Sequence, residues 1–480
     1  MCILKKIGMN KLKYIIIAVV MMVVSSCNDW LTIKPKDKVE KTKLYETEDG
    51  FWQALNGLYD KLRGSMYYHT YNIPWMATSD RLVGVWEDKG ELTLSGRLEA
   101  HMYNETNVDG LMEIHFLNFY QVIAHANTIL AYVDNVSFLS SQAHALIKGE
   151  ALAIRAFMHF ELIRTWGPMP NSVEDGYAYL PYVRDVSRNA HDYSNYADYM
   201  NMLLADLTEA ENLLAEYDPI LTYSNAELNV NSLLGGYDRL DYNYRQHHMN
   251  YYGVCALRAR VALWMGDVQN AITYARTVIN ATNEDGTKKF TLGVSDDVTT
   301  AGSEDNNNNS LPTEHVFGTY VEDFNWDELF ASNTQGEHLY MSASKLTDIY
   351  SYNSNDWRAE KWYVPFEDYV TTVKFRHRIN FWLPFIRLSE MYLILAEELP
   401  ISEANVVYQE FCSLKGLPTV QLTENERQIE ILMEYYKEFI AEGQLFFVNK
   451  RMGIRKVLWL DEDMAEQQYV LPLPDRETNF

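Results

Sequence analysis

The sequence predicts an all-α protein, and three observations support that prediction. Apolar residues recur at helical spacing in several segments between residues 150 and 440. The alternation of apolar and polar residues that marks a half-buried strand is not sustained anywhere. The segment 251–279 also has the small-residue pattern of two closely packed helices. A chain of 480 residues is long enough to bury a sizeable core around such helices.

Two helices are predicted in the first half of the chain. The segment 150–166 is apolar on nearly every side, as a buried helix would be, and Gly167-Pro168 ends it. Within it, Glu161 and Arg164 are spaced to meet on one face. The second helix, 196–214, carries one apolar stripe made of Tyr199, Met200, Leu203, Leu207, Ala210 and Leu214.

Two further helices are predicted near the C-terminus. One covers 385–398, begins after Pro384 and carries its own apolar stripe. The other covers 429–440. A capping-box pattern that begins at Thr423 indicates its start, and Gly443 suits the left-handed conformation that often follows a helix.

The segment 251–279 is predicted to form a pair of helices. Two helical stretches meet at Gly266 and Asp267, and the side chain of Asp267 is suited to cap the second one. No other segment matches this pattern well, so we expect helix pairs that stack less regularly than a repeat array. The small residues that let the pair approach closely, as in tetratricopeptide units, are Ala259, Ala262, Ala271 and Ala275.

Three stretches interrupt the helices without clear periodicity: 63–110, 216–248 and 281–383. Segments of this length inside a compact domain are usually functional or disordered, and these are too rich in aromatic residues for disorder. We expect ordered loops whose aromatic rings suit the recognition of sugar rings or peptides, with packing onto the scaffold as the competing interpretation. The tryptophans selected as candidate ligand platforms are Trp75, Trp86, Trp326 and Trp357.

The N-terminus resembles the signal peptide of a bacterial lipoprotein. Lysines precede the apolar run 14–24, and two serines lead directly to Cys27. In such a signal the cysteine thiol receives the lipid and becomes the new N-terminus. We therefore expect residues 1–26 to be removed and residues 27–480 to form a single domain anchored through Cys27.

Other interpretations of this segment stay open. A transmembrane anchor needs about 20 apolar residues, more than the run provides, and Asn28 and Asp29 follow the cysteine at once. A plain secretory signal with a coincidental cysteine has the same basic and apolar regions. Met1 and Met9 are both candidate starts of translation.

The chain is strongly acidic, with 66 Asp and Glu against 41 Lys and Arg and a formal net charge of −25. Such a surface repels polyanions, so we expect no nucleic-acid partner and attachment to a membrane through the lipid alone. Cys2 and Cys27 belong to the leader, which leaves Cys255 and Cys412. We expect two buried thiols there, although the sequence leaves a disulfide between them open.

No motif in the sequence points to catalysis, a cofactor or a metal ion. The chain has no HExxH, paired CxxC, complete EF-hand loop, Gly-rich phosphate loop or nucleophile elbow. His247 and His248 are adjacent, which directs their side chains apart on a helix or a strand, and His159 is predicted to be a core histidine. A glycoside hydrolase would need two carboxylates about 5–10 Å apart, and no local motif singles out such a pair. We expect no catalytic residue and no cofactor, and a bound metal ion is left open.

The segment 148–168, KGEALAIRAFMHFELIRTWGP, resembles the signature of the SusD/RagB family of surface lipoproteins in Bacteroidetes-type bacteria. Four other stretches follow the family pattern in order: DWLTIKP with TEDGFWQALNGLY, the helix pair around Gly266, RLSEMYLILAEE (387–398) and LPLPDRETNF (471–480). The resemblance therefore covers nearly the whole chain after the leader. The residues that occupy the signature positions are Glu150, Arg155, Ala156, Phe157, Arg164, Trp166 and Gly167.

The segment 434–451 departs in part from the family pattern. Charged residues of the family pattern in this segment are interpreted as a structural ion network, so losing some of them bears on local packing more than on function. Glu438, Phe439, Glu442, Gly443 and Arg451 match, whereas Tyr435, Leu445 and Val448 stand where Arg, Arg and Asp are expected.

The resemblance implies a helical scaffold with tetratricopeptide-like pairs, located on the outer membrane and facing the medium. Members of the family are not enzymes. They sit as a lid on a TonB-dependent barrel transporter of the SusC type, capture an oligosaccharide or in some cases a peptide, and pass it on. Their ligand residues lie in variable loops without a motif, so none transfers by position. Besides this function, a surface-anchored glycoside hydrolase and a protein-binding adhesin remain as alternatives.

Overall fold

The computed structural model describes residues 43–66, 74–87, 93–187, 189–229, 241–298, 309–321, 339–350, 355–376, 382–418 and 421–478. Contacts within the chain divide it into two units, Met1–Phe51 and Trp52–Phe480. In the described part of the first unit, the rings of Tyr45 and Phe51 pack edge to face with centroids 5.0 Å apart. The expected boundary at Cys27 lies outside the described residues.

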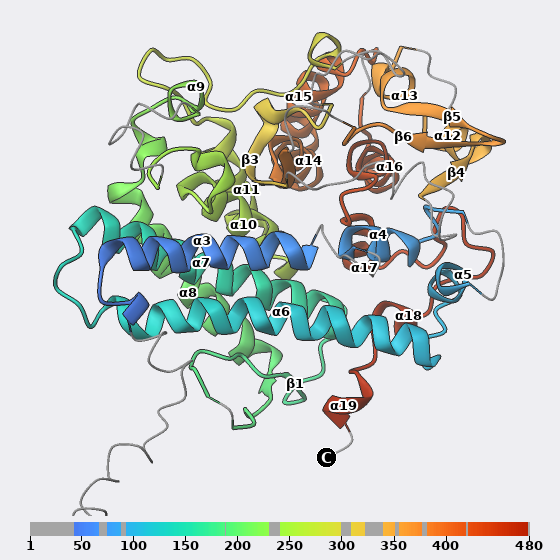
Figure 1. Cartoon of the computed structure of the whole chain (residues 1–480). Helices are drawn as coiled ribbons and strands as arrows, with labels where there is room; N and C mark the ends of the chain where they lie inside the picture. The colour runs from blue at the N-terminus through green and yellow to red at the C-terminus, as the bar shows by residue number, and fades with distance from the viewer. Residues whose placement is uncertain are drawn as a thin grey trace, which may run out of the picture. The chain divides into compact units, whose positions relative to one another are not determined.

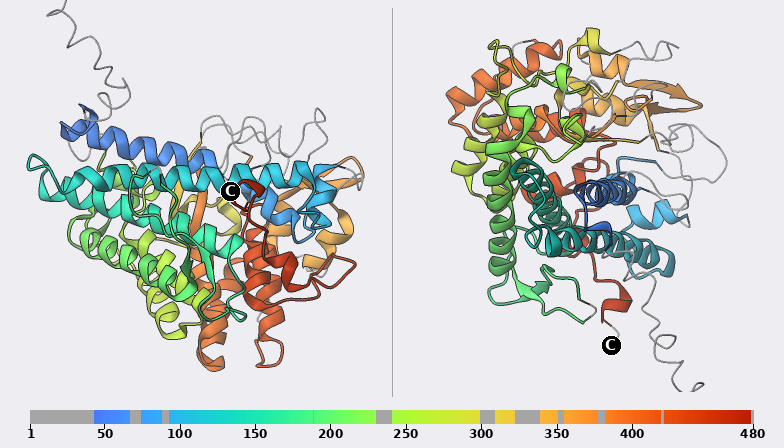
Figure 2. Two further views of the ribbon diagram at one scale, coloured as in Figure 1. Left: turned by 90° about the horizontal axis from the view of Figure 1, so that it is seen from below. Right: turned by 60° about the vertical axis from the view of Figure 1, so that its left-hand side comes forward.

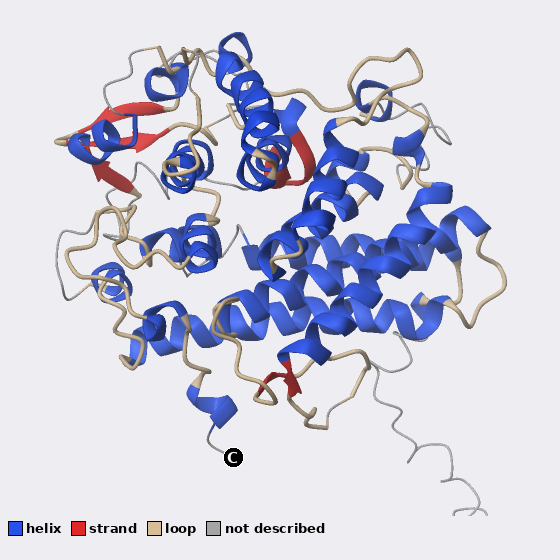
Figure 3. Ribbon diagram, turned by 180° about the vertical axis from the view of Figure 1, so that it is seen from behind, coloured by secondary structure: helices blue, strands red, loops and turns tan. Residues whose placement is uncertain are grey.

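Helices make up most of the described chain, which confirms the predicted fold class (Figures 1 and 3). The longer helices are α3 (Glu48–Met66), α6 (Thr106–Val133), α7 (Ser141–Trp166), α8 (Tyr196–Tyr217), α10 (Tyr251–Met265), α11 (Val268–Ile279), α14 (Leu388–Glu398), α15 (Ile401–Leu414) and α16 (Arg427–Phe439). The shorter ones are α4 (Trp75–Arg81), α5 (Leu94–Glu99), α9 (Asn225–Leu228), α12 (Ala343–Tyr350), α13 (Trp357–Lys361), α17 (Leu445–Met452), α18 (Glu466–Tyr469) and α19 (Asp475–Thr478). Single 3-10 turns are η1 (Pro219–Leu221), η3 (Arg245–His247), η4 (Ser295–Asp297) and η5 (Pro312–Glu314).

The helices of the second unit stack as successive pairs. α7 packs against α6 and α8, α10 against α11, and α14 against α15, while α8–α10 and α11–α14 contacts join the pairs (Figures 1 and 2). The predicted pair at 251–279 is confirmed. Gly266 has the left-handed conformation at φ 72°, and the side chain of Asp267 accepts a hydrogen bond from the backbone of Asn270. The stack therefore extends beyond the single pair that the sequence identified.

Helix α7 forms the centre of this stack. Every residue from Gly149 to Trp166 is buried, which fits its apolar character on all sides. The predicted end at Gly167 is confirmed, and the predicted pair of Glu161 and Arg164 forms with a 2.5 Å contact. The whole predicted stripe of α8 is likewise buried.

Short antiparallel strands connect the helices, and the sequence did not predict them. β1 (Ala178–Leu180) pairs with β2 (Ser194–Asn195), β3 (His315–Tyr320) with β7 (Trp382–Arg387), and β6 (Tyr369–Thr372) lies between β4 (Tyr340–Ser342) and β5 (Tyr363–Phe366). All residues of β3 except the last are buried, so no polar alternation marks it. The stretch 281–383 is therefore not purely irregular.

The prediction of a helix from residue 385 was wrong at its start. Pro384 lies inside β7 opposite Gly318, and α14 begins only at Leu388. A proline is tolerated here because β7 pairs with a single strand, β3.

Two further expectations concern cysteines and membrane spans. Cys255 and Cys412 are both buried and free, as expected. No helix in the described ranges has the length and apolar character needed to cross a membrane.

Candidate ligand-binding site

An open pocket of about 510 Å³ lies where α3, the turn η3 and the end of β3 meet. Both aromatic and polar side chains reach it, and they come from segments far apart in the sequence. The lining residues are Asn56, Gly57, Tyr59, Asp60, Arg63, His247, His248, Thr319 and Tyr320.

Helix α3 supplies one wall because its two faces differ. Leu55, Leu58 and Leu62 are fully buried and recur at helical spacing. Residues one or two positions further along fall on the other face, where side chains three or four apart are neighbours. The pocket-facing residues of the helix are Asn56, Gly57, Tyr59, Asp60 and Arg63.

Behind this wall lies the fully buried carboxylate of Glu150, in α7. The Tyr59 hydroxyl donates to it at 2.5 Å, and Nδ1 of His248 lies 2.9 Å from the same oxygen. Burial alone would raise the pKa of Glu150, but the charges of Arg245 and His248 outweigh it and lower the pKa to about 2. Burial and the adjacent carboxylate raise the pKa of Tyr59 well above its ordinary value, so the phenol stays protonated. One buried charge thus holds two pocket-lining side chains.

Arg245 links Glu150 to a second buried carboxylate, that of Asp218. Its Nη1 donates to Glu150 at 2.5 Å, while Nε and Nη2 donate to Asp218 at 2.8 and 3.0 Å. Asp218 also accepts the backbone N–H of Tyr251, the first residue of α10, at 2.8 Å. The back of the pocket is therefore tied to the start of the α10–α11 pair by charge-assisted hydrogen bonds.

The pocket lining includes a partly exposed aromatic residue. Tyr320, the last residue of β3, is 38% exposed and pairs across the ladder with Trp382. Arg63 donates to its carbonyl oxygen at 3.1 Å and to the carboxylate of Asp60. A flat ring beside amide, carboxylate and guanidinium groups can stack on a sugar face and bond its hydroxyls.

The two adjacent histidines of the pocket point to different partners, as predicted. His248 faces the carboxylate of Glu150. The ring of His247 packs edge to face against Trp382, with centroids 4.5 Å apart. Burial and the neighbouring His248 lower the pKa of His247 to about 3.

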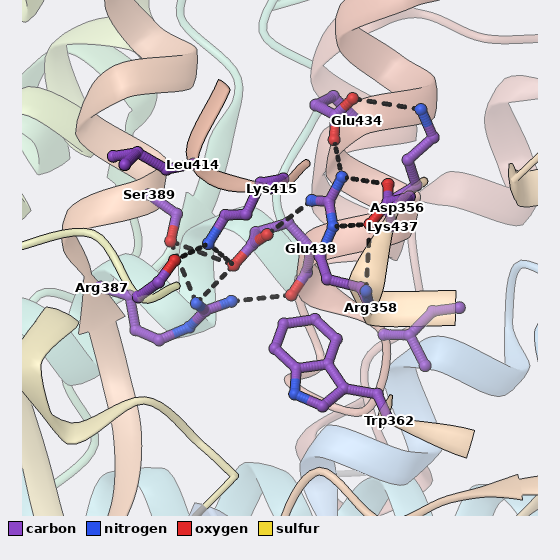
Figure 4. Close-up of polar contacts among 12 residues, drawn as sticks. Asp356, Arg358, Trp362, Arg387, Ser389, Leu414, Lys415, Glu434, Lys437 and Glu438 are labelled. Atoms are coloured by element: carbon purple, nitrogen blue, oxygen red, sulfur yellow. Dashed lines mark hydrogen bonds and ion pairs between the residues drawn. The ribbon is translucent and has the colours of Figure 1, made fainter. Parts of the chain in front are cut away.

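A second cluster of charged residues is built around Glu438 of α16 (Figure 4). Its carboxylate accepts from Arg358 at 2.7 Å and from Arg387 at 2.6 Å. Arg358 also donates to Asp356 at 2.7 Å and to Glu434 at 2.5 Å. All of these side chains are buried and bind one another, so we interpret this cluster as structural.

Two of the three departures from the family pattern line one small cavity. Tyr435 and Val448 border an internal space of about 30 Å³, together with the buried arginines Arg164 and Arg260. These two departures therefore lie beside buried arginines, and their expected effect on local packing stays a prediction.

Comparisons with known proteins agree with this architecture. Residues 29–225 match a SusD-like family described as "Starch-binding associating with outer membrane". A SusD-like protein of Formosa agariphila is 24% identical over 207 residues, which are 43% of this chain and 38% of that protein. A SusD superfamily protein from Bacteroides vulgatus has a TM-score of 0.68 at 20% identity, over 90% of this chain and 96% of that one. Surface glycan-binding protein A from Bacteroides thetaiotaomicron, in complex with laminarihexaose, has a TM-score of 0.64 at 15% identity, over 90% and 97%.

The chain is similar to SusD-like proteins in sequence over residues 29–225 and in fold.

The structure places three of the predicted tryptophans in the core. Trp75 is 1% exposed and stacks on Trp166 with centroids 6.1 Å apart, and Trp86 is fully buried. Trp357 is 6% exposed, and its Nε1 donates to the carbonyl of Leu414 at 2.9 Å. A sugar cannot stack on these rings while the surrounding chain covers them. Their role as ligand platforms stays a prediction, and their burial disfavours it. Trp326 and Cys27 lie outside the described residues.

The pocket residues were missed because no local motif connects them. The sequence offered one usable signal, the polar face of α3 opposite Leu55, Leu58 and Leu62. Tyr320 falls in a strand that the sequence did not predict. In the ranges that the structure describes, no three His, Cys, Asp or Glu side chains gather so as to hold a metal ion.

Proposed function

We propose that this SusD-like protein captures an oligosaccharide in the pocket between Tyr59 and Tyr320 and delivers it to a SusC-like TonB-dependent transporter. The observation that carries the proposal is the pocket itself. Its volume of about 510 Å³ falls in the range of small-ligand sites, and it combines an exposed ring with convergent polar groups. The family description and the glycan named for a structural neighbour favour a glycan over a peptide.

The composition of the lining supports binding rather than hydrolysis. A glycoside hydrolase places two carboxyl groups about 5–10 Å apart on either side of the scissile bond. Among the described residues that line the pocket, Asp60 alone carries a carboxylate. Glu150 lies behind the wall and is committed to Arg245, Tyr59 and His248.

The proposed location rests on the leader sequence and on the family description, which associates the family with the outer membrane. In this proposal Cys27 receives the lipid, residues 27–480 form one domain on the cell surface, and the protein acts as the lid of the transporter. The tether keeps the lid beside its barrel, while stacking and hydrogen bonds supply the binding energy.

Titration calorimetry of the mature chain, produced without its lipid, against a panel of neutral and acidic oligosaccharides and peptides tests this function. We expect heat from at least one glycan, and we expect Tyr320→Ala to weaken that binding at least tenfold. Tyr177→Ala is the matched control, because Tyr177 is 54% exposed and lies outside the pocket. Binding of peptides alone would contradict glycan capture, and release of reducing sugar would identify a hydrolase.

A further inference from the structure

His247 lines the wall of the pocket and has two buried ring nitrogens that form no hydrogen bond within the described part of the chain. The residue borders the pocket, yet both nitrogens are shielded from solvent. The ring packs edge to face on Trp382, with centroids 4.5 Å apart. Buried polar groups in native proteins are nearly always paired, so this unpaired imidazole needs a reason.

His159 in α7 shows what a structural imidazole looks like in the same chain. Its Nδ1 lies 2.8 Å from the hydroxyl of Tyr199, and its Nε2 lies 3.3 Å from the carbonyl of Val183. Burial lowers the pKa of both His159 and His247 to about 3. A phenylalanine at 247 would fill the same space against Trp382 without unpaired nitrogens, so packing alone does not account for the imidazole.

The chemistry of a neutral imidazole fits a hydroxyl group. Uncharged His247 has one N–H donor and one bare nitrogen that accepts. A 180° turn of the ring about Cβ–Cγ exchanges nitrogen and carbon positions within nearly the same volume, which lets the pocket-facing edge present a nitrogen. A hydroxyl donates and accepts, and therefore matches either nitrogen, whereas a carboxylate or a sulfate only accepts.

The charges around the pocket also favour an uncharged ligand. Arg63 is engaged by the carboxylate of Asp60 and by the carbonyl of Tyr320. Behind the wall, Arg245 is engaged by Glu150 and Asp218. Within the described lining, no lysine or arginine other than Arg63 is present to receive an anion.

We propose that His247 hydrogen-bonds a hydroxyl of an uncharged glycan, and that the pocket discriminates against anionic glycans such as uronic-acid chains. This inference rests on the proposed function, because it concerns the pocket assigned to oligosaccharide capture.

The His247→Phe variant separates a ligand-binding imidazole from a structural one. We expect it to bind the tightest neutral oligosaccharide of the panel at least tenfold more weakly, while its Tm stays equal or rises because two unpaired nitrogens are gone. His247→Asn, which keeps a donor and an acceptor, should retain more affinity than the Phe variant. The matched control is His159→Phe, which should lower Tm and leave the affinity of the folded fraction within twofold.

Two results of this comparison would overturn the inference. One is unchanged affinity in His247→Phe. The other is a loss of Tm in His247→Phe as large as that in His159→Phe, which would mark a structural imidazole.

A second arm of the experiment compares charged and uncharged ligands on the wild-type chain. Oligogalacturonate of matched length should bind at least tenfold more weakly than the tightest neutral oligosaccharide. Tighter binding of the acidic ligand would overturn this inference and leave glycan capture standing. Absence of binding to every neutral and acidic oligosaccharide would overturn both proposals.

Discussion

The hydroxyl of Tyr59 lies 2.5 Å from the carboxylate of Glu150, and this contact connects the pocket wall to the central helix. Glu150 is the acidic residue of the family signature in α7, while Tyr59 lines the pocket from α3. The same carboxylate also holds His248. Glu150, which stands out in the sequence through the family resemblance, therefore holds the pocket wall from behind.

Replacing Glu150 by Gln should destabilise the protein strongly at neutral pH. The change keeps the shape but removes the buried negative charge that Arg245 faces at 2.5 Å. Breaking a buried pair in this way costs roughly 3–5 kcal/mol. Urea denaturation measures the loss. The control is Glu209→Gln. Glu209 pairs with Lys148 and its side chain is 48% exposed, so we expect this change to lower the unfolding free energy by about 1 kcal/mol or less.

The effect of Glu150→Gln should also depend on pH. The pKa of Glu150 is lowered from 4.5 to about 2 in the folded chain, so the unfolded chain binds the proton more readily between those values. The stability from this carboxylate is fully present above about pH 4.5 and is lost as pH falls toward 2. The difference in unfolding free energy between wild type and variant should therefore narrow on acidification. A constant difference would contradict the lowered pKa of Glu150.

Asp80 in α4 should produce the opposite pH dependence. It is fully buried, and burial raises its pKa from 3.8 to about 8. The hydrogen bond that it accepts from the backbone N–H of Ala441 at 2.9 Å lowers the pKa, but by less than burial raises it. The folding stability that protonated Asp80 contributes is fully present below about pH 3.8 and is lost as pH rises through 8. Asp80→Asn keeps the acceptor for Ala441 and should be more stable than wild type by up to about 5 kcal/mol at pH 9. Equal slopes of unfolding free energy between pH 4 and 9 in both proteins would contradict this.

Gly443 is required by both its backbone conformation and its neighbours. Its φ is +68°, and an added Cβ would lie 2.6 Å from Cα of Met76 in α4. Gly443→Ala should cost about 2–4 kcal/mol in unfolding free energy, from left-handed strain and displaced backbone. Gly64→Ala in α3 is the control, because an added Cβ there meets nothing within 4 Å. Alanine favours a helix over glycine, so this variant should gain up to about 1 kcal/mol in unfolding free energy. Thermal unfolding of the two variants should therefore shift in opposite directions.

Cys27→Ala should abolish attachment of lipid to the protein. The expected processing uses the thiol of this residue, so labelled palmitate should enter the wild-type chain and not the variant. Cys2→Ala is the matched control, because Cys2 lies in the leader that processing removes. Equal labelling of both variants would contradict an anchor at Cys27.

The helical scaffold was predictable because its signals are local. The α8 stripe from Tyr199 to Leu214 and the turn at Gly266 and Asp267 each depend on residues close in sequence. The strands were missed because β3 is buried along nearly its whole length and has no polar alternation. Pro384 suggested a helix start but lies in a strand.

The candidate site was harder to predict because its residues are distant in sequence. Tyr59, Glu150 and His248 meet only after α3, α7 and η3 have packed. Tryptophans in irregular segments suggested platforms, yet Trp75 and Trp86 pack into the core because their large apolar area gains most from burial. Aromatic composition alone does not distinguish a binding surface from a core.

A crystal structure of the chain soaked with the tightest-binding neutral oligosaccharide would show directly whether this pocket holds the sugar. We expect sugar density in the pocket, with a ring against Tyr320 and a hydroxyl within hydrogen-bond distance of His247. Sugar bound elsewhere on the molecule, with the pocket between Tyr59 and Tyr320 empty, would contradict this expectation.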